Sequence, residues 1–223
     1  MIKAVIFDLD GVLVTTDELH YVAWKKLAES IGIKNFTKED NVRQRGVSRM
    51  ASLDVLLEKS NKKYSIEEKN TLANLKNSIY VDSLQTLSAT DVLPGVFDFI
   101  NFLKLKGIKI AIGSASKNTP LILEKTGLSV YFDAISCGLD TEKSKPEPDV
   151  FIIAANKLGI PCADCVVIED SDAGIEAAKR AGMFAIAVGA AKNNPEADFS
   201  SETLDSFDYM NNKLFVSEHY SEL

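Results

Sequence analysis

Two aspartates near the start of the chain, Asp8 and Asp10, are the first residues whose types and spacing suggest chemistry. They follow the uncharged run 4–7 and precede Gly11, which is typical of a buried parallel strand that ends in a turn. Because side chains alternate along a strand, both carboxylates start on one face, at the edge where open α/β sheets bind ligands. Such close carboxylates repel each other unless a cation compensates or one stays protonated. The spacing indicates a metal-assisted reaction centre; two solvated aspartates in a turn are the simpler alternative.

Three further segments place polar groups where predicted strands end. Ser114 opens a hydroxyl-rich segment before a helix, which suits a phosphate oxygen, and Lys145 stands in a proline-rich turn. Glu169 and Asp170 form a second carboxylate pair. Taken singly, these segments are also compatible with a serine turn, a surface loop and an acidic helix cap. Together with Asp8 they indicate a hard-oxygen site for Mg²⁺ beside donors for a phosphoryl group.

Alternating strands and helices follow Pro94-Gly95, and this order predicts a doubly wound parallel sheet with right-handed crossovers. Asp149 is predicted to cap one of these helices. The predicted strands span 4–7, 109–113, 134–136, 165–168 and 184–188, and the predicted helices span 96–106, 118–126, 149–159 and 171–181.

An all-helical stretch separates the first predicted strand from the others. Apolar spacing predicts helices over 17–31 and 48–59, and the capping box Ser65-Ile-Glu-Glu68 predicts a third that runs to about 84. Asp17 suits the N-cap of the first. The stretch is too long for a loop, so it predicts a separate helical lobe. The expected division is an α/β core of residues 1–15 and 86–223 and a helical cap of residues 16–85, with hinges near 13–16 and 86–91. The last twenty or so residues are expected to form a closing helix or a tail.

Composition restricts the partners and the location. The chain has 223 residues and a net charge of −7, which disfavours nucleic acid or an anionic membrane as main partner. There is no apolar run of membrane-spanning length, and the N-terminus is unlike a secretory signal, so we expect a cytoplasmic protein. The spacing of Cys162 and Cys165 matches a redox motif, but Cys165 leads into a predicted strand, so we expect a structural role. Without an obvious interface stripe, we expect a monomer.

At the four polar segments the chain resembles the haloacid dehalogenase superfamily, whose motifs correspond to Asp8-Leu-Asp10, Ser114, Lys145 and Glu169-Asp170. It resembles the β-phosphoglucomutase branch of that superfamily still more closely. The segments that carry this closer resemblance are Arg45-Gly-Val-Ser-Arg49, Ser114-Ala-Ser-Lys-Asn118, Tyr131-Phe-Asp-Ala134, Ser144-Lys-Pro146 and Glu169-Asp-Ser171. The chain departs from the branch at three positions, where Asp, Lys and Glu are usual: Thr15, Arg45 and Met50.

The resemblance implies a Rossmann-like core with an inserted all-helical cap, and it implies a role for each acidic residue. Asp8 would be the nucleophile that forms an aspartyl-phosphate. Asp10 would be the general acid and base, and its backbone carbonyl would contact Mg²⁺. Glu169 and Asp170 would complete the metal site.

The resemblance also implies the activity, which is interconversion of β-glucose 1-phosphate and glucose 6-phosphate through a 1,6-bisphosphate. Ser114 and Lys145 would hold the transferring phosphate, and Arg49 would help to hold the distal one. The other residues implied in sugar-phosphate binding or closure are His20, Trp24, Gly46, Val47, Ser48, Ser52, Lys76, Ala115, Ser116, Lys117 and Asn118. A hydrolase of small sugar phosphates with the same fold is the alternative enzyme, and a phosphosugar-binding module is the alternative without catalysis. Arg49 is the residue that separates a mutase from a hydrolase.

Overall fold

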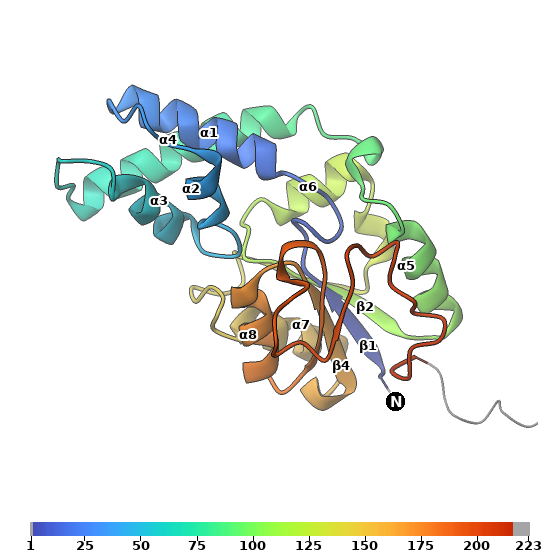
Figure 1. Cartoon of the computed structure of the whole chain (residues 1–223). Coiled ribbons are helices and arrows are strands. Elements are labelled where there is room, and N and C mark those ends of the chain that lie inside the picture. Colours follow the sequence, from blue (N-terminus) through green and yellow to red (C-terminus); the bar gives the residue numbers. More distant parts are fainter. Residues whose placement is uncertain (1, 216–223) are drawn as a thin grey trace, which may run out of the picture.

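A six-stranded parallel sheet lies at the centre of the computed structural model, which describes residues 2–215 (Figure 1). The strand order is β3-β2-β1-β4-β5-β6. The predicted doubly wound parallel sheet is therefore confirmed. The strands are β1 Ala4–Phe7, β2 Lys109–Gly113, β3 Ala134–Ser136, β4 Cys165–Glu169, β5 Phe184–Ala187 and β6 Phe199–Ser200.

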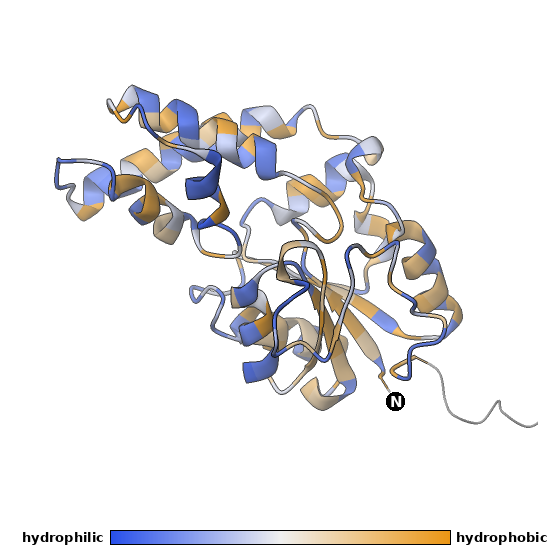
Figure 2. Cartoon of the chain, in the orientation of Figure 1, coloured by the Kyte–Doolittle hydropathy of each residue, from blue (hydrophilic) through white to orange (hydrophobic). Residues whose placement is uncertain are grey.

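Alternating side chains of the strands enter two different hydrophobic clusters, one on each face of the sheet. Val5 and Phe7 of β1 pack with α5 (Val96–Leu105) and α6 (Thr119–Thr126). Ala4 and Ile6 pack with α7 (Asp149–Leu158) and α8 (Asp172–Arg180). Because both faces of β1 are buried, this strand is an uninterrupted apolar run rather than an alternating one (Figure 2). Burial of Val5, Ile6 and Phe7 contributes about 1.5–3 kcal/mol each, which stabilises the strand that leads to Asp8.

The first four of the α-helices between β1 and β2, which we call the helical lobe, lie apart from the sheet in Figure 1. They are α1 Asp17–Ser30, α2 Lys38–Val42, α3 Arg49–Leu57 and α4 Ile66–Leu84. The lobe has its own hydrophobic cluster, to which Trp24, Leu53 and Leu56 contribute. The predicted capping box opens α4, with Ser65 N–H donating to Glu68 at 2.8 Å. The five-residue α2 was not predicted, because it is too short to show a helical period.

The two connections between the helical lobe and the sheet run side by side. Val14 forms an antiparallel bridge with Val92, and the Leu93 N–H donates to the Leu13 carbonyl at 2.9 Å. The short 3₁₀ helix Ala89–Asp91 lies just before the second connection. The chain therefore enters and leaves the lobe at one place.

Two predicted helix caps are wrong by one residue. Asp17 is the first residue of α1 rather than its N-cap, because the position before it is Thr16, whose hydroxyl donates to Asp10 instead. Asp149 likewise is the first residue of α7, preceded by Pro148. Both acids still lie in a first helical turn, where the helix dipole favours negative charge.

The C-terminal segment was expected to form a closing helix or a tail, and the part that the structure describes is not helical. Residues 201–215 form turns and irregular structure that cover the sheet with Leu204, Phe207 and Phe215. The two-residue β6 was not predicted, because so short a strand carries no periodic signal. Residues 216–223 lie outside the described residues.

Within residues 2–215, none of the helices combines the length and apolar composition that a membrane crossing requires. The three cysteines are free thiols, and Cys165 opens β4 as predicted.

Candidate active site

Asp8, Lys145 and Glu169 form a buried charged cluster at the carboxyl end of the sheet. Asp8 directly follows β1, and Glu169 is the last residue of the adjacent β4. The Lys145 ammonium lies 2.5 Å from Asp8 Oδ1 and 2.7 Å from Glu169 Oε2. The Lys145 side chain is only 1% exposed, so its charge interacts with these carboxylates with little screening by water. The lysine thus joins two of the sequence-predicted motifs at one point.

Glu169 is held by bonds to both of its carboxylate oxygens. Oε2 accepts from Lys145, and Oε1 accepts from the Ser171 hydroxyl at 2.6 Å. Ser171 is also the N-cap of α8, so the start of this helix fixes the orientation of the glutamate. Glu169 therefore presents a preorganised carboxylate to its neighbours.

Asp170 approaches the backbone of Gly11, and this approach requires glycine. A Cβ at Gly11 would lie 2.1 Å from Asp170 Oδ2, and the φ of Gly11 is +81°, which side-chain-bearing residues rarely adopt. The glycine in Asp8-Leu-Asp10-Gly11 consequently leaves room for the second carboxylate pair.

Asp8, Glu169 and Asp170 offer carboxylate oxygens that all lie within 4.8 Å of one another. Burial, followed by the Glu169 charge, raises the pKa of Asp8 to about 8, and the same two causes raise the pKa of Asp170 to about 8. For Lys145, burial opposes protonation, but Asp8 and Glu169 outweigh it and raise its pKa. Lys145 alone therefore does not compensate the charge of three ionised carboxylates. A divalent cation with hard oxygen ligands fits this donor set.

The Asp10 carboxylate is not part of that three-carboxylate group. Asp10 accepts a hydrogen bond from the Thr16 hydroxyl. Burial raises its pKa to about 6, while the bond from Thr16 acts in the opposite direction. A carboxyl group that titrates near neutral pH is suited to proton transfer.

The segment after β2 forms the turn that the sequence predicts for a phosphate. The Ser114 hydroxyl accepts from the Ser116 N–H, and the Ser116 hydroxyl accepts from the Asn118 N–H, both at 3.2 Å. Asn118 occupies the N-cap position of α6, but its side chain donates to Asn77 of α4 at 3.0 Å instead of capping the helix. This bond joins the core to the helical lobe.

His20 and Lys76 face each other on the lobe side of the site. Lys76 Nζ lies 2.8 Å from His20 Nδ1 and 4.6 Å from the centre of the Trp24 ring. Burial, and next Arg49, lower the pKa of Lys76 to about 7, and burial lowers the pKa of His20 well below its usual value. Both shifts favour the uncharged forms of Lys76 and His20, which share one hydrogen bond.

Residues 46–49, which lead into α3, form another wall of the site. The Ser48 hydroxyl caps α3 by accepting from the Ala51 N–H at 3.2 Å. Arg49 is the first residue of α3, and within residues 2–215 it has no salt-bridge partner. The Ser52 hydroxyl donates to the Gln44 carbonyl at 3.5 Å, and the Ser52 carbonyl accepts from Gln44 Nε2 at 2.8 Å. Arg49 is thus a cation available to a ligand.

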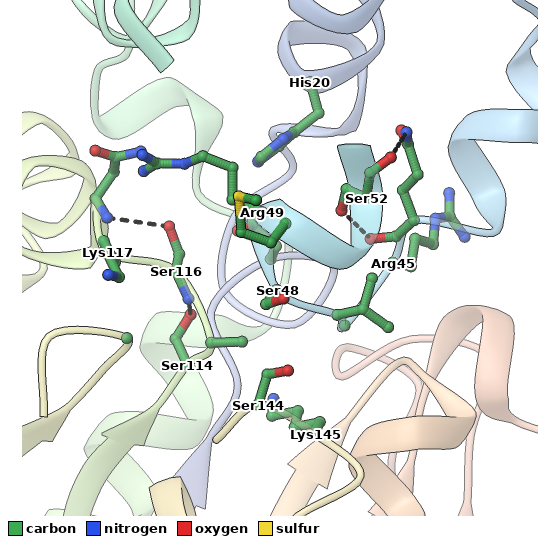
Figure 3. Close-up of a pocket in the computed structure, with 18 of the residues that line it drawn as sticks. His20, Arg45, Ser48, Arg49, Ser52, Ser114, Ser116, Lys117, Ser144 and Lys145 are labelled. Atoms are coloured by element: carbon green, nitrogen blue, oxygen red, sulfur yellow. Dashed lines mark hydrogen bonds between the residues drawn. The ribbon is translucent and has the colours of Figure 1, made fainter. Parts of the chain in front are cut away.

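These groups line one pocket of about 860 Å³ between the helical lobe and the sheet. Figure 3 shows Ser48 and Arg49 on the opposite side of the pocket from Ser114, Ser144 and Lys145. Glu169, which is 1% exposed, is the one predicted site residue that does not line it. The predicted residues that line the pocket are Asp8, Asp10, His20, Trp24, Gly46, Val47, Ser48, Arg49, Ser52, Lys76, Ser114, Ala115, Ser116, Lys117, Asn118, Lys145 and Asp170.

Among the residues of the site that were not predicted, Thr16, Asn77 and Tyr80 make hydrogen bonds that connect it. Thr16 bonds Asp10, and Tyr80 in turn bonds Thr16. Tyr80 stands four residues after Lys76, so it shares a face of α4 with it, and this spacing was the available signal. Asn77 gave no signal, because its partner Asn118 is distant in sequence.

The family model of haloacid dehalogenase-like hydrolases matches residues 2–182 of the chain. The chain belongs to this family. Among individual members, β-phosphoglucomutase of Bacillus subtilis is 44% identical over 189 residues, which cover 84% of this chain and 83% of that protein. A phosphorylated carbohydrates phosphatase of Thermotoga maritima is 33% identical and covers 81% of this chain and 82% of its own.

The solved structure of β-phosphoglucomutase from Clostridium difficile is similar along nearly the whole chain. It matches with a TM-score of 0.88 and 39% identity and covers 94% of this chain and 95% of that one. The family membership and the β-phosphoglucomutase resemblance that the motifs indicated are therefore confirmed.

Proposed function

We propose that this protein is a Mg²⁺-dependent mutase that interconverts β-glucose 1-phosphate and glucose 6-phosphate. The reaction passes through an aspartyl-phosphate at Asp8 and a glucose 1,6-bisphosphate. Similarity to the two β-phosphoglucomutases supports this activity.

Asp8 and Asp10 divide the chemistry between them. An Asp8 carboxylate oxygen attacks phosphorus, the bond from phosphorus to the sugar oxygen breaks, and Asp10 donates a proton to that oxygen. In the opposite half-reaction Asp10 accepts the proton of a sugar hydroxyl, whose oxygen takes the phosphoryl group from Asp8. The pKa of Asp10, about 6, suits both directions.

Lys145 and Ser114 stabilise the phosphoryl group while it moves. Lys145 already contacts Asp8 and supplies positive charge for the equatorial oxygens, and Ser114 offers a hydroxyl from the end of β2. Phosphoryl transfer has a loose transition state, so such positioned charges supply most of the acceleration. Asp8, Glu169 and Asp170 would hold the Mg²⁺, which when bound neutralises phosphate charge.

One observation carries the choice of a mutase: Arg49, free of salt bridges among the described residues, faces the pocket that Ser116, Lys117 and Asn118 line from the other side. A mutase must hold the distal phosphate of the bisphosphate while the other phosphate reacts. The planar guanidinium of Arg49 is suited to clamp it. We infer that residues 16–85 act as a cap on the core of residues 1–15 and 86–223, and that closing the cap excludes water from the aspartyl-phosphate.

The test is an assay with β-glucose 1-phosphate, Mg²⁺ and a trace of glucose 1,6-bisphosphate as primer. Glucose 6-phosphate and released inorganic phosphate are measured in the same reaction. We expect isomerisation to outpace phosphate release by orders of magnitude and to depend on the primer. A higher rate of phosphate release would contradict the mutase and support a hydrolase.

A sugar-phosphate hydrolase is the second candidate, favoured by the similarity to the Thermotoga phosphatase. It would use the same centre, with water in place of the second sugar hydroxyl. We further infer a cytoplasmic monomer, and sedimentation at enzyme concentrations tests the oligomeric state.

A further inference from the structure

Tyr80 is the start of a buried hydrogen-bond chain that ends on Asp10. The Tyr80 hydroxyl donates to Thr16 Oγ1 at 3.0 Å, and the Thr16 hydroxyl donates to Asp10 Oδ1. Both Tyr80 and Thr16 are 0% exposed. A threonine hydroxyl has a single hydrogen, so accepting from Tyr80 leaves that hydrogen for Asp10.

The ring of the same tyrosine supports the pair on the lobe side of the site. The His20 ring lies 4.0 Å from the Tyr80 ring, centre to centre, and Lys76 Nζ lies 4.5 Å from the ring centre. These contacts are stacking and cation–π interactions. Tyr80 therefore touches three residues of the site through two different parts of its side chain.

A purely packing role explains the ring but not the hydroxyl. Phenylalanine would fill the same space in α4, and a buried hydroxyl without a partner destabilises the folded state. Burial and the nearby Asp10 charge raise the pKa of Tyr80 well above its usual value, so the phenol stays a donor.

We propose that the Tyr80 hydroxyl is a positioning group for the general acid and base, acting on Asp10 through Thr16. Tyr80 belongs to α4, and Thr16 precedes α1. The two hydrogen bonds therefore link the helical lobe to the proton-transfer residue in the core. The inference rests on the proposed role of Asp10 in phosphoryl transfer.

A double-mutant cycle on the full chain with Mg²⁺ tests this inference. We expect Tyr80→Phe to lower kcat about 3- to 10-fold, as loss of one neutral hydrogen bond implies, with KM changed less than about twofold. Thr16→Val removes the hydroxyl that links Tyr80 to Asp10, so the double variant with Tyr80→Phe should have the same kcat as Thr16→Val alone. Thr16→Ser keeps a hydroxyl and should preserve the sensitivity to Tyr80→Phe.

Two further variants separate positioning from packing. Tyr64→Phe removes a hydroxyl from the same lobe that makes no hydrogen bond within the described residues, and it should leave kcat unchanged. Replacement of Tyr80 by 4-aminophenylalanine restores a donor and should recover most of the lost kcat, even where Tyr80→Phe folds poorly.

An unchanged kcat in Tyr80→Phe, or an equal loss in the wild-type and Thr16→Val backgrounds, would overturn the inference. Failure of the proposed mutase would show separately, in the wild-type protein. If the wild type only released phosphate, the double-mutant cycle would use kcat for phosphate release, because that reaction also needs the proton from Asp10.

Discussion

The ammonium of Lys145 lies 2.7 Å from Glu169 Oε2, and both side chains are 1% exposed. A buried charge pair contributes little net stability by itself, but removal of one partner leaves an uncompensated buried charge. The same lysine contacts Asp8, so its loss leaves two carboxylates without their cation. This arrangement makes Lys145 both a structural and a chemical residue.

Lys145→Ala should therefore lower the free energy of unfolding of the metal-free protein by about 3–5 kcal/mol, measured in urea. It should also lower kcat about 100- to 1000-fold, because one preorganised positive group is removed from the transferring phosphate. Lys179→Ala is the matched control, since Lys179 pairs with Asp198 at 2.7 Å on the surface. The control should cost less than about 1 kcal/mol and leave kcat unchanged. Equal effects of both substitutions would contradict the assigned role.

The raised pKa values of Asp8 and Asp170, both about 8, predict how stability depends on pH without metal. Between the ordinary carboxyl range and pH 8 the folded state binds more protons than the unfolded state, so stability should fall as pH rises. Bound Mg²⁺ needs the ionised carboxylates, so its affinity should increase over the same interval.

Thermal unfolding at pH 6 and pH 8 measures both effects. The midpoint of the metal-free protein should be lower at pH 8, and Mg²⁺ should raise the midpoint more at pH 8 than at pH 6. Asp170→Asn, which removes one of the three carboxylates, should largely abolish the response to Mg²⁺. A response to Mg²⁺ that is equal at the two pH values would exclude this linkage.

The sheet was predictable because its central strands are buried on both faces and are short apolar runs that end at turn residues. The regular helices were predictable from their period and from local caps, such as Ser65 and Ser171. The elements that were missed, α2 and β6, have five and two residues, which are too few to show a period. Caps at 17 and 149 were misplaced by one residue, because tertiary partners or a neighbouring proline decide those boundaries.

For the candidate site, the residue types at strand ends were sufficient to predict that Asp8, Lys145 and Glu169 lie close together. Only the family resemblance implied different roles for Asp10 and Asp170; residue types at strand ends did not indicate which carboxylate turns away. Asp10 bonds Thr16, while Asp170 joins the other acids. That choice depends on the room beside Gly11 and on Tyr80 behind Thr16. Such contacts arise only when the lobe and the core are packed together.

Gly46 predicts a test of the close approach between the lobe and the core. A Cβ at Gly46, whose φ is +71°, would lie 2.6 Å from Ser171 Oγ, and that hydroxyl orients Glu169. Gly46→Ala should therefore lower kcat at least tenfold and weaken Mg²⁺ binding, measured by titration calorimetry. Gly32→Ala is the matched control: Gly32 has φ +83° and open space around its Cβ position. Gly32→Ala should lower the free energy of unfolding by the same amount for a left-handed backbone, about 1 kcal/mol, and should leave kcat and Mg²⁺ affinity unchanged.

Arg49 predicts a difference between two reactions of the same centre. Arg49→Ala removes the proposed clamp on the distal phosphate, which isomerisation needs and hydrolysis of a small phosphate ester does not. Isomerisation should fall about 100-fold or more, as expected for loss of a charged hydrogen-bonding partner, while slow hydrolysis of p-nitrophenyl phosphate changes little. Arg43→Ala serves as the control, because Arg43 lies in the same lobe but pairs with Glu58 at 2.8 Å on the surface, and both rates should stay unchanged. Equal losses of the two activities in Arg49→Ala would mean that Arg49 supports the reaction centre as a whole, and the distal clamp would then have to be abandoned.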